Sequence, residues 1–291
     1  MIPVFYTVLF FLKAVFTPGL DRIDHKRVHL IHVNKHKIAH LDSLIDESSA
    51  LARVPDSSDC ILTLNDSGGK PEVFAVTGHG ALLHTYPIPF AKNKDWEELI
   101  YIEDTINHQS HIVIGDVGNN SNKKNELSLY DYSITKDSIV QHVFYYEDRM
   151  AFQPSKENMN YDCEAFFKKD SAYYFISKNR SKGPVKIYQL IQDTIYHKAV
   201  IVQKILLKGM VTACSVLSSQ NKNKDDKLVV LTYGRIYLFY IYPTDFAVKL
   251  IPYGVIPFPG CGQAEGITWL NEKELLMSNE KGNLFRILIK R

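Results

Sequence analysis

A loosely repeated unit of about 50 residues is the feature that most limits how this chain can fold. Each copy opens with a short run of acidic, small and apolar residues, and the copies begin at Glu47, Glu97, Glu164, Cys214 and Glu265. The intervals between these positions are 50, 67, 50 and 51 residues. A self-similar period in this range, with several short strands inside each copy, predicts a β-propeller.

A second pattern keeps the same spacing. About 13 to 23 residues after each opening position, an apolar run ends in polar residues. These run ends are Asn65 and Asp66, Asp116 with Asn119 and Asn120, Ser177 and Lys178, Thr232 and Tyr233, and Asn279 and Glu280. Two matched registers rarely arise together by chance, so we treat the repeat as real.

The strand count predicts how the propeller closes. The first four copies each hold four strand candidates, whereas the last copy holds three before the chain ends at Arg291. Residues 28–42 read as an extra strand pair ahead of the first copy. An N-terminal strand commonly completes the last blade of a propeller and leaves no open sheet edge. We therefore predict one all-β propeller domain over 28–291, with a closing strand near 28–33. Five blades are favoured, and the 67-residue interval keeps six as the alternative.

Composition excludes some classes of function. The chain has 34 basic and 32 acidic residues and a net charge of +2, so it has no general attraction to nucleic acid or to an anionic membrane. Its four cysteines form no CxxC pair, which argues against a zinc site. Buried free thiols are the favoured interpretation, and disulfide pairing among Cys163, Cys214 and Cys261 is left open.

The N-terminal segment, residues 1–20, is apolar from Ile2 to Leu12 and is then interrupted by Lys13. It is too short and too broken for a confident membrane span. As an export signal it lacks a basic residue before the apolar run and a clear cleavage site after it. We predict a degenerate signal and a periplasmic, extracellular or envelope-associated protein, with a cytoplasmic protein as the alternative.

Strand alternation predicts where polar side chains gather. The opening strand of each blade starts at one rim of the central channel, and the antiparallel second strand ends at that rim. The expected metal ligands are Glu47, Glu97, Asp116, Glu164 and Glu265; the expected ligand-binding residues are Asn65, Asp66, Asn120, Lys178, Tyr233 and Glu280. Crowded carboxylates need compensating charge. Oxygen donors suit Ca²⁺ or Mg²⁺, so we expect Ca²⁺. Alternatively, the carboxylates accept backbone hydrogen bonds and tie the blades together.

Three motifs carry a family resemblance that covers roughly residues 40–290. They are Asn65-Asp66-Ser67-Gly68, Asp95-Trp96-Glu97, and the run with Gly115, Asp116, Gly118 and Asn120. The chain resembles a family of bacterial β-propeller proteins, often exported, whose members carry NDSG, DWED and GDxGDN. It departs from them at Glu98 and Asn119, where Asp is usual, and the change at Asn119 argues against a tightly bound cation there. The chain is more distantly similar to gluconolactonase and esterase-like phytase propellers, which place metal or substrate at the channel mouth. That likeness concerns the fold alone.

Two functions from different classes follow. The first is a binding or scaffold propeller of the cell envelope, which holds a small polar ligand, a polymer or a protein at the acidic rim. The second is a divalent-metal-dependent hydrolase of lactones or phosphoesters, with one carboxylate as general base. No ordered catalytic constellation is visible, which favours binding. We also predict that Trp96 packs between the first two blades and positions Glu97.

Overall fold

The computed structural model describes residues 18–23, 28–55, 57, 59–104, 107, 109–149, 159–181, 183–191, 197–219, 221 and 224–290. These residues form β-strands and loops, apart from one short 3₁₀ helix at Glu147–Arg149. Nowhere in these ranges is there a helix with the length and apolar character needed to span a bilayer. Most of the predicted export signal, residues 1–17, lies outside the described residues, as do residues 150–158 of the 67-residue interval.

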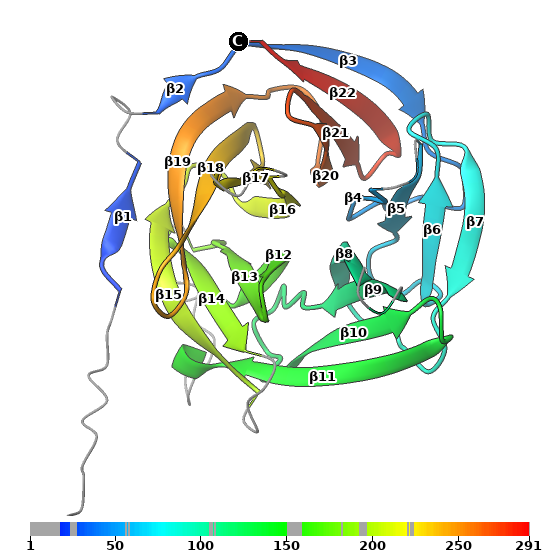
Figure 1. Cartoon of the computed structure of the whole chain (residues 1–291), viewed down its shortest axis with the longest axis horizontal. Coiled ribbons are helices and arrows are strands. Elements are labelled where there is room, and N and C mark those ends of the chain that lie inside the picture. The colour runs from blue at the N-terminus through cyan, green and yellow to red at the C-terminus, as the bar shows by residue number, and fades with distance from the viewer. Residues whose placement is uncertain are drawn as a thin grey trace, which may run out of the picture.

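Twenty of the 22 described strands form five antiparallel sets of four, which we call units 1 to 5 (Figure 1). Unit 1 contains β4 (Ala52–Arg53), β5 (Ile61–Leu64), β6 (Glu72–Val76) and β7 (Leu82–Pro87). Unit 2 contains β8 (Trp96–Asp104), β9 (Gln109–Asp116), β10 (Leu127–Ser133) and β11 (Ser138–Tyr146). Unit 3 contains β12 (Asp162–Lys169), β13 (Ala172–Lys178), β14 (Val185–Ile191) and β15 (Lys198–Leu206).

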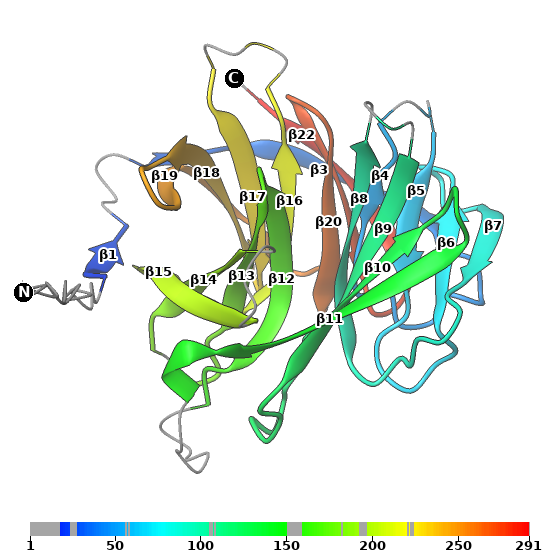
Figure 2. The same ribbon diagram turned by 60° about the horizontal axis from the view of Figure 1, so that its bottom comes forward.

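Unit 4 contains β16 (Val211–Leu217), β17 (Asp226–Thr232), β18 (Arg235–Pro243) and β19 (Val248–Pro257). Unit 5 contains β20 (Ala264–Asn271), β21 (Glu274–Asn279), β22 (Asn283–Ile289) and β3 (Val33–His40), which comes from the start of the chain. The first strand of each unit lies nearest the centre, and later strands lie progressively further out (Figures 1 and 2). This is the arrangement of a β-propeller.

The hydrophobic core lies between consecutive units. Each of five buried clusters combines side chains from two neighbouring units. One of them joins unit 5 to unit 1 through Leu276 and Leu284 on one side and Ile61 and Phe74 on the other. Trp96 is fully buried in the cluster between units 1 and 2, so the predicted packing of this residue is confirmed. Cys163, Cys214 and Cys261 are buried free thiols, as expected.

The strand that pairs with the last unit is not the one that we predicted. Residues 33–40, as β3, run antiparallel to β22, with Val33 opposite Ile289 and His40 opposite Asn283. Apart from Val33, the predicted segment near 28–33 contributes only β2 (His29–Leu30), which pairs in parallel with β19. Residues 28–42 are therefore not a strand pair. The eight-residue β3 covers the open edge of β22, which the two-residue β2 is too short to do.

In two copies of the repeat, the predicted opening residue does not coincide with the equivalent structural position. The innermost strands shift register by one residue, a β-bulge, at Glu97, Glu164, Thr212 and Glu265. In unit 1 the register shift falls between the Ser48–Asn65 bridge and the Ala52–Leu62 pair. Ser49, the residue after the bridge, is therefore the equivalent of the bulge residues in the other units. The predicted opening residues Glu47 and Cys214 are thus each two residues away from the true repeat position. We call Ser49, Glu97, Glu164, Thr212 and Glu265 the bulge ring.

Candidate functional site

A cavity of about 240 Å³ opens where the innermost strands begin, and we call it the acidic cup. Six carboxylates and two cationic side chains line it. From the predicted set it contains Glu47, Asp66, Glu97, Asn120, Glu164, Lys178, Tyr233, Glu265 and Glu280; Ser48, Ser49, Arg180 and Gln263, which sequence reasoning missed, complete it. The structure thus brings together most of the residues that the two repeat registers selected. What they bind stays a prediction.

Two predicted residues, Asn65 and Asp116, do not line the cup. Each lies directly opposite the residue that precedes the bulge, in the pairs Ser48–Asn65 and Trp96–Asp116. Side chains alternate between the two faces of a strand, so the residue that follows Asn65 faces the cup instead; this residue is Asp66. Asn65 donates to the carbonyl of Leu44 over 2.9 Å, and Asp116 lies 3.6 Å from Lys124 Nζ.

Glu164 is paired with cations from its own unit. It forms an ion pair with Lys178, and Arg180 Nη2 lies 3.3 Å from its Oε1. Burial raises the pKa of Glu164 to about 8, although Lys178 acts in the opposite direction. Arg180 also donates from Nε to Asp162 Oδ2 over 2.6 Å and bonds to Asn120. Its guanidinium therefore bridges two carboxylates at one side of the cup.

Glu265 is paired across a unit boundary. Tyr233 of unit 4 donates its hydroxyl to Glu265 Oε1 over 2.6 Å. Burial raises the pKa of Glu265 to about 7, while Lys178 and the Tyr233 hydrogen bond oppose that rise. Lys178 Nζ lies 5.3 Å from the centroid of the Tyr233 ring, which gives the cation an aromatic neighbour as well. Glu280, at the mouth, accepts a 2.6 Å hydrogen bond from Gln263.

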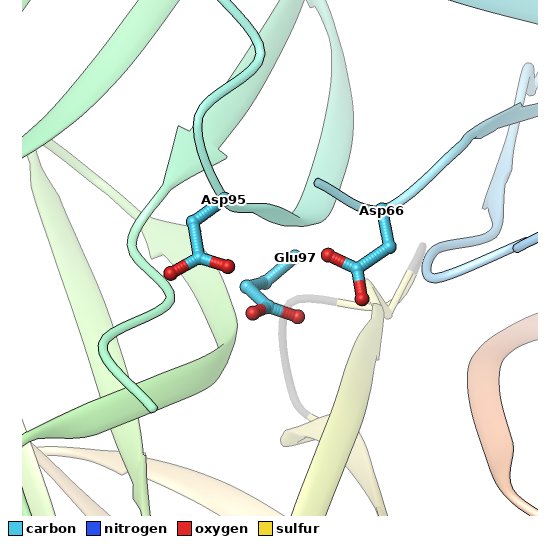
Figure 3. A group of neighbouring side chains, drawn as sticks. All are labelled: Asp66, Asp95 and Glu97. Carbon is cyan, nitrogen blue, oxygen red and sulfur yellow. The ribbon is translucent and has the colours of Figure 1, made fainter. Parts of the chain in front are cut away.

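Glu97 differs from the other two bulge-ring glutamates. Only 4% of it is exposed, and within the described part of the chain its carboxylate has no hydrogen-bond or ion-pair partner. Burial, followed by the nearby charges of Glu164 and Asp66, raises its pKa well above the ordinary value. Figure 3 shows the carboxylates of Asp66, Asp95 and Glu97 turned towards one another.

Glu97 belongs to two groups of three carboxylates. One oxygen each from Asp66, Asp95 and Glu97 lie within 4.8 Å of one another, and the same holds for Glu97, Asp162 and Glu164. Sequence reasoning did not select Asp95 or Asp162 as site residues. The signal that could have found them is the repeated Asp-x-Glu at Asp95–Glu97 and Asp162–Glu164, which opens two consecutive units.

The backbone beside this group has no room for a side chain. A Cβ atom at Gly118 would overlap the carboxylates of Glu97 and Asp95. Asp95 Oδ2 lies 2.9 Å from Lys124 Nζ, so one member of the group has a cation on its outer side. One residue further along β8, the fully buried Glu98 does not line the cup and accepts a hydrogen bond from the backbone N–H of Cys214.

No protein-family model matches the chain, and no curated protein matches it. Two solved structures are similar in fold. The crystal structure of BBS1N in complex with ARL6DN, soaked with lead, is 9% identical with a TM-score of 0.43, covering 91% of this chain and 98% of that one. The apo-form soluble aldose sugar dehydrogenase from Escherichia coli is 8% identical with a TM-score of 0.49, covering 89% and 100%. Function is therefore argued from the site.

Proposed function

We propose that this chain is a binding module, a five-bladed propeller closed by β3, whose acidic cup holds one divalent cation, Ca²⁺. The blade count is supported by the five four-stranded units and by the core cluster that joins unit 5 to unit 1. Closure is supported by the ladder that β3 forms along β22. Export of the protein remains part of the proposal, and N-terminal mass spectrometry after cell fractionation tests it.

The unpartnered carboxylate of Glu97 carries the cation proposal. A buried charged group is costly unless it has a partner. Glu164 has Lys178 and Glu265 has Tyr233, but no described side chain forms a hydrogen bond or ion pair with the Glu97 carboxylate. A cation between Glu97, Asp66 and Asp95 would supply that partner. Ca²⁺ takes six to eight oxygen ligands at about 2.3–2.6 Å, so oxygens within 4.8 Å of one another suit one ion, with water from the cup completing its shell.

Hydrolysis of lactones or phosphoesters remains the second candidate. Its support is that Glu164 and Glu265, with pKa values raised to about 8 and about 7, titrate in the range that general acid–base catalysis needs. Against it, Lys178 and Arg180 are both tied to carboxylates and so are not free to bind an anionic substrate. Binding alone accounts for the site with fewer requirements. Assays with lactone and phosphoester substrates in the presence of Ca²⁺ separate the two.

Calcium titration by calorimetry and by thermal melting tests the proposal. After chelation, CaCl₂ should raise the melting temperature of the wild-type protein; at about 100 times Kd the expected stabilisation is about 2.7 kcal/mol. Glu97→Gln should melt higher than wild type without Ca²⁺, because it removes carboxylate repulsion, and should not respond to Ca²⁺. Glu103→Gln is the matched control, on the same strand but exposed and outside the cup. A wild-type protein that ignores Ca²⁺ contradicts the proposal.

A further inference from the structure

We infer that the acidic cup contains two repeat-related carboxylate subsites, and that Arg180 is the built-in cation of the second, so that the cup takes one divalent ion and not two. Subsite A comprises Asp66, Asp95 and Glu97; subsite B comprises Glu97, Asp162 and Glu164. The assignment of an external ion to subsite A rests on the proposed function. The assignment of Arg180 to subsite B stands on the geometry of unit 3.

The two subsites come from the same element of consecutive units. An Asp-x-Glu sequence lies at the beginning of the innermost strand in unit 3 and starts one residue before it in unit 2, and in both units the Glu occupies the bulge. A bulge redirects the side chain of the extra residue, which is why both glutamates turn into the cup. Glu97 is common to both groups, so the subsites are adjacent and joined by one carboxylate.

Subsite B already holds a cation. The guanidinium of Arg180 places Nε 2.6 Å from Asp162 Oδ2 and Nη2 3.3 Å from Glu164 Oε1. Both contacts are charge-assisted, and the planar fork of arginine suits two carboxylates at once. The second oxygen of Asp162 accepts the backbone N–H of Asn119 over 2.6 Å, so this carboxylate is fully engaged.

Subsite A lacks the equivalent. Lys124 reaches Asp95 from outside, but among the described residues no cationic side chain comes within ion-pair distance of Glu97 or Asp66. The pairing registers explain the difference. In unit 3, Ile176 lies opposite Ala165, and Lys178 follows Ile176 by two residues. In unit 2, Gly115 lies opposite Glu98, and the residue two positions after Gly115 is the buried Val117. Unit 2 therefore carries an apolar residue where unit 3 carries the cation that pairs with its bulge glutamate.

The occupied subsite bears on the choice between binding and hydrolysis. Two subsites of three carboxylates each, which share Glu97, could hold two ions side by side, as two-metal hydrolases do. With Arg180 in subsite B, the second ion is replaced by a guanidinium that cannot activate a water. The cup is then a one-ion site.

The stoichiometry of Ca²⁺ binding tests this inference. Calorimetry on the full chain should give one ion for the wild type, two for Arg180→Gln, and one for Arg180→Lys, which keeps the charge. Adding Asp162→Asn to Arg180→Gln should return the value to one. Methylguanidinium should displace the second ion from Arg180→Gln and leave the first in place, because it restores the missing group.

The outcomes separate the inference from the proposed function. One ion in the wild type and one in folded Arg180→Gln overturns the inference and leaves the proposed function standing. In another outcome, the wild type binds no ion while Arg180→Gln binds one that is lost when Asp162→Asn is added. That result upholds the role of Arg180 and overturns the proposed function. No ion in either overturns both. If Arg180→Gln is unfolded by itself and Ca²⁺ or methylguanidinium restores its folding, the inference is upheld. If it is unfolded and neither of them restores its folding, the inference is overturned.

Discussion

Glu98 joins two innermost strands across the centre of the molecule: its Oε2 accepts a 2.9 Å hydrogen bond from the backbone N–H of Cys214. Its Oε1 accepts the N–H of Leu99 over 3.1 Å, so both oxygens are used. Burial raises the pKa of Glu98 well above its ordinary value, against the effect of these two hydrogen bonds. The contact ties unit 2 to unit 4, which share no buried cluster.

Glu98→Ala should destabilise the fold, because it leaves the buried N–H of Cys214 without an acceptor. A buried donor without a partner costs about 1–3 kcal/mol of unfolding free energy. Glu98→Gln keeps an acceptor oxygen and should lose less. Urea unfolding, with circular dichroism as the signal, gives both values. Equal stability of Glu98→Ala and the wild type would show that the Cys214 contact contributes nothing.

The ion-free protein should lose stability as the pH rises from about 5 to about 8. Glu164 and Glu265 have folded-state pKa values raised to about 8 and about 7, above their unfolded values. Groups with raised pKa values bind protons more tightly in the folded state, so their stabilisation is full below the unfolded pKa and is lost above the folded one.

Ca²⁺ in the acidic cup would also compete with the proton on Glu97, whose pKa is raised well above its ordinary value. The effect of Ca²⁺ on the melting temperature should therefore be larger at pH 8 than at pH 6. Melting curves at both pH values, with Ca²⁺ and with chelator, measure this difference. The double variant Glu164→Gln and Glu265→Gln should flatten the profile of the ion-free protein. A wild-type profile that rises between pH 5 and 8 would contradict the assignment.

Trp96→Ala should cost about 3–5 kcal/mol of unfolding free energy, as expected when a buried large side chain is removed. Trp96 fills the space between units 1 and 2, donates from Nε1 to the Lys92 carbonyl over 3.2 Å, and precedes Glu97 directly. Trp96→Phe should cost less and keep the response to Ca²⁺. Chemical denaturation gives the stability, and calorimetry gives the ion binding. Loss of ion binding in a stable Trp96→Phe protein would point to a role beyond packing.

The position of a truncation should decide whether unit 5 keeps its fourth strand. Deleting residues 1–31 removes β1 (Leu20–Arg22) and β2, which pair with the outer edges of β15 and β19. Deleting residues 1–41 also removes β3 and exposes the edge of β22. We expect cooperative thermal unfolding for the first protein and its loss, with aggregation, for the second. Two truncated proteins that melt alike would argue against closure by β3.

The internal repeat allowed much of the architecture to be predicted. The all-β class, the grouping into four-stranded units and the contribution of an N-terminal strand to the last unit all follow from hydrophobic periodicity and strand count. The gathering of Glu97, Glu164 and Glu265 also follows from the repeat, because equivalent residues of equivalent strands must lie around a common axis. These are consequences of local pattern and of symmetry, which a sequence carries along its whole length.

The tertiary structure decided the finer features. A bulge inserts one residue and changes which side chain faces the centre, and the local sequence does not mark it, so Glu47 and Cys214 were misaligned by two positions. The same alternation turns Asn65 and Asp116 away from the cup. Which carboxylate has a partner depends on contacts between distant residues, such as Arg180 with Asp162 and Glu98 with Cys214. The sequence by itself determined that acidic side chains would meet at one rim. Only packing in three dimensions decided that, among the described glutamates of the bulge ring, Glu97 would be the one without a hydrogen-bond or ion-pair partner, because pairing depends on distances that the order of residues does not encode.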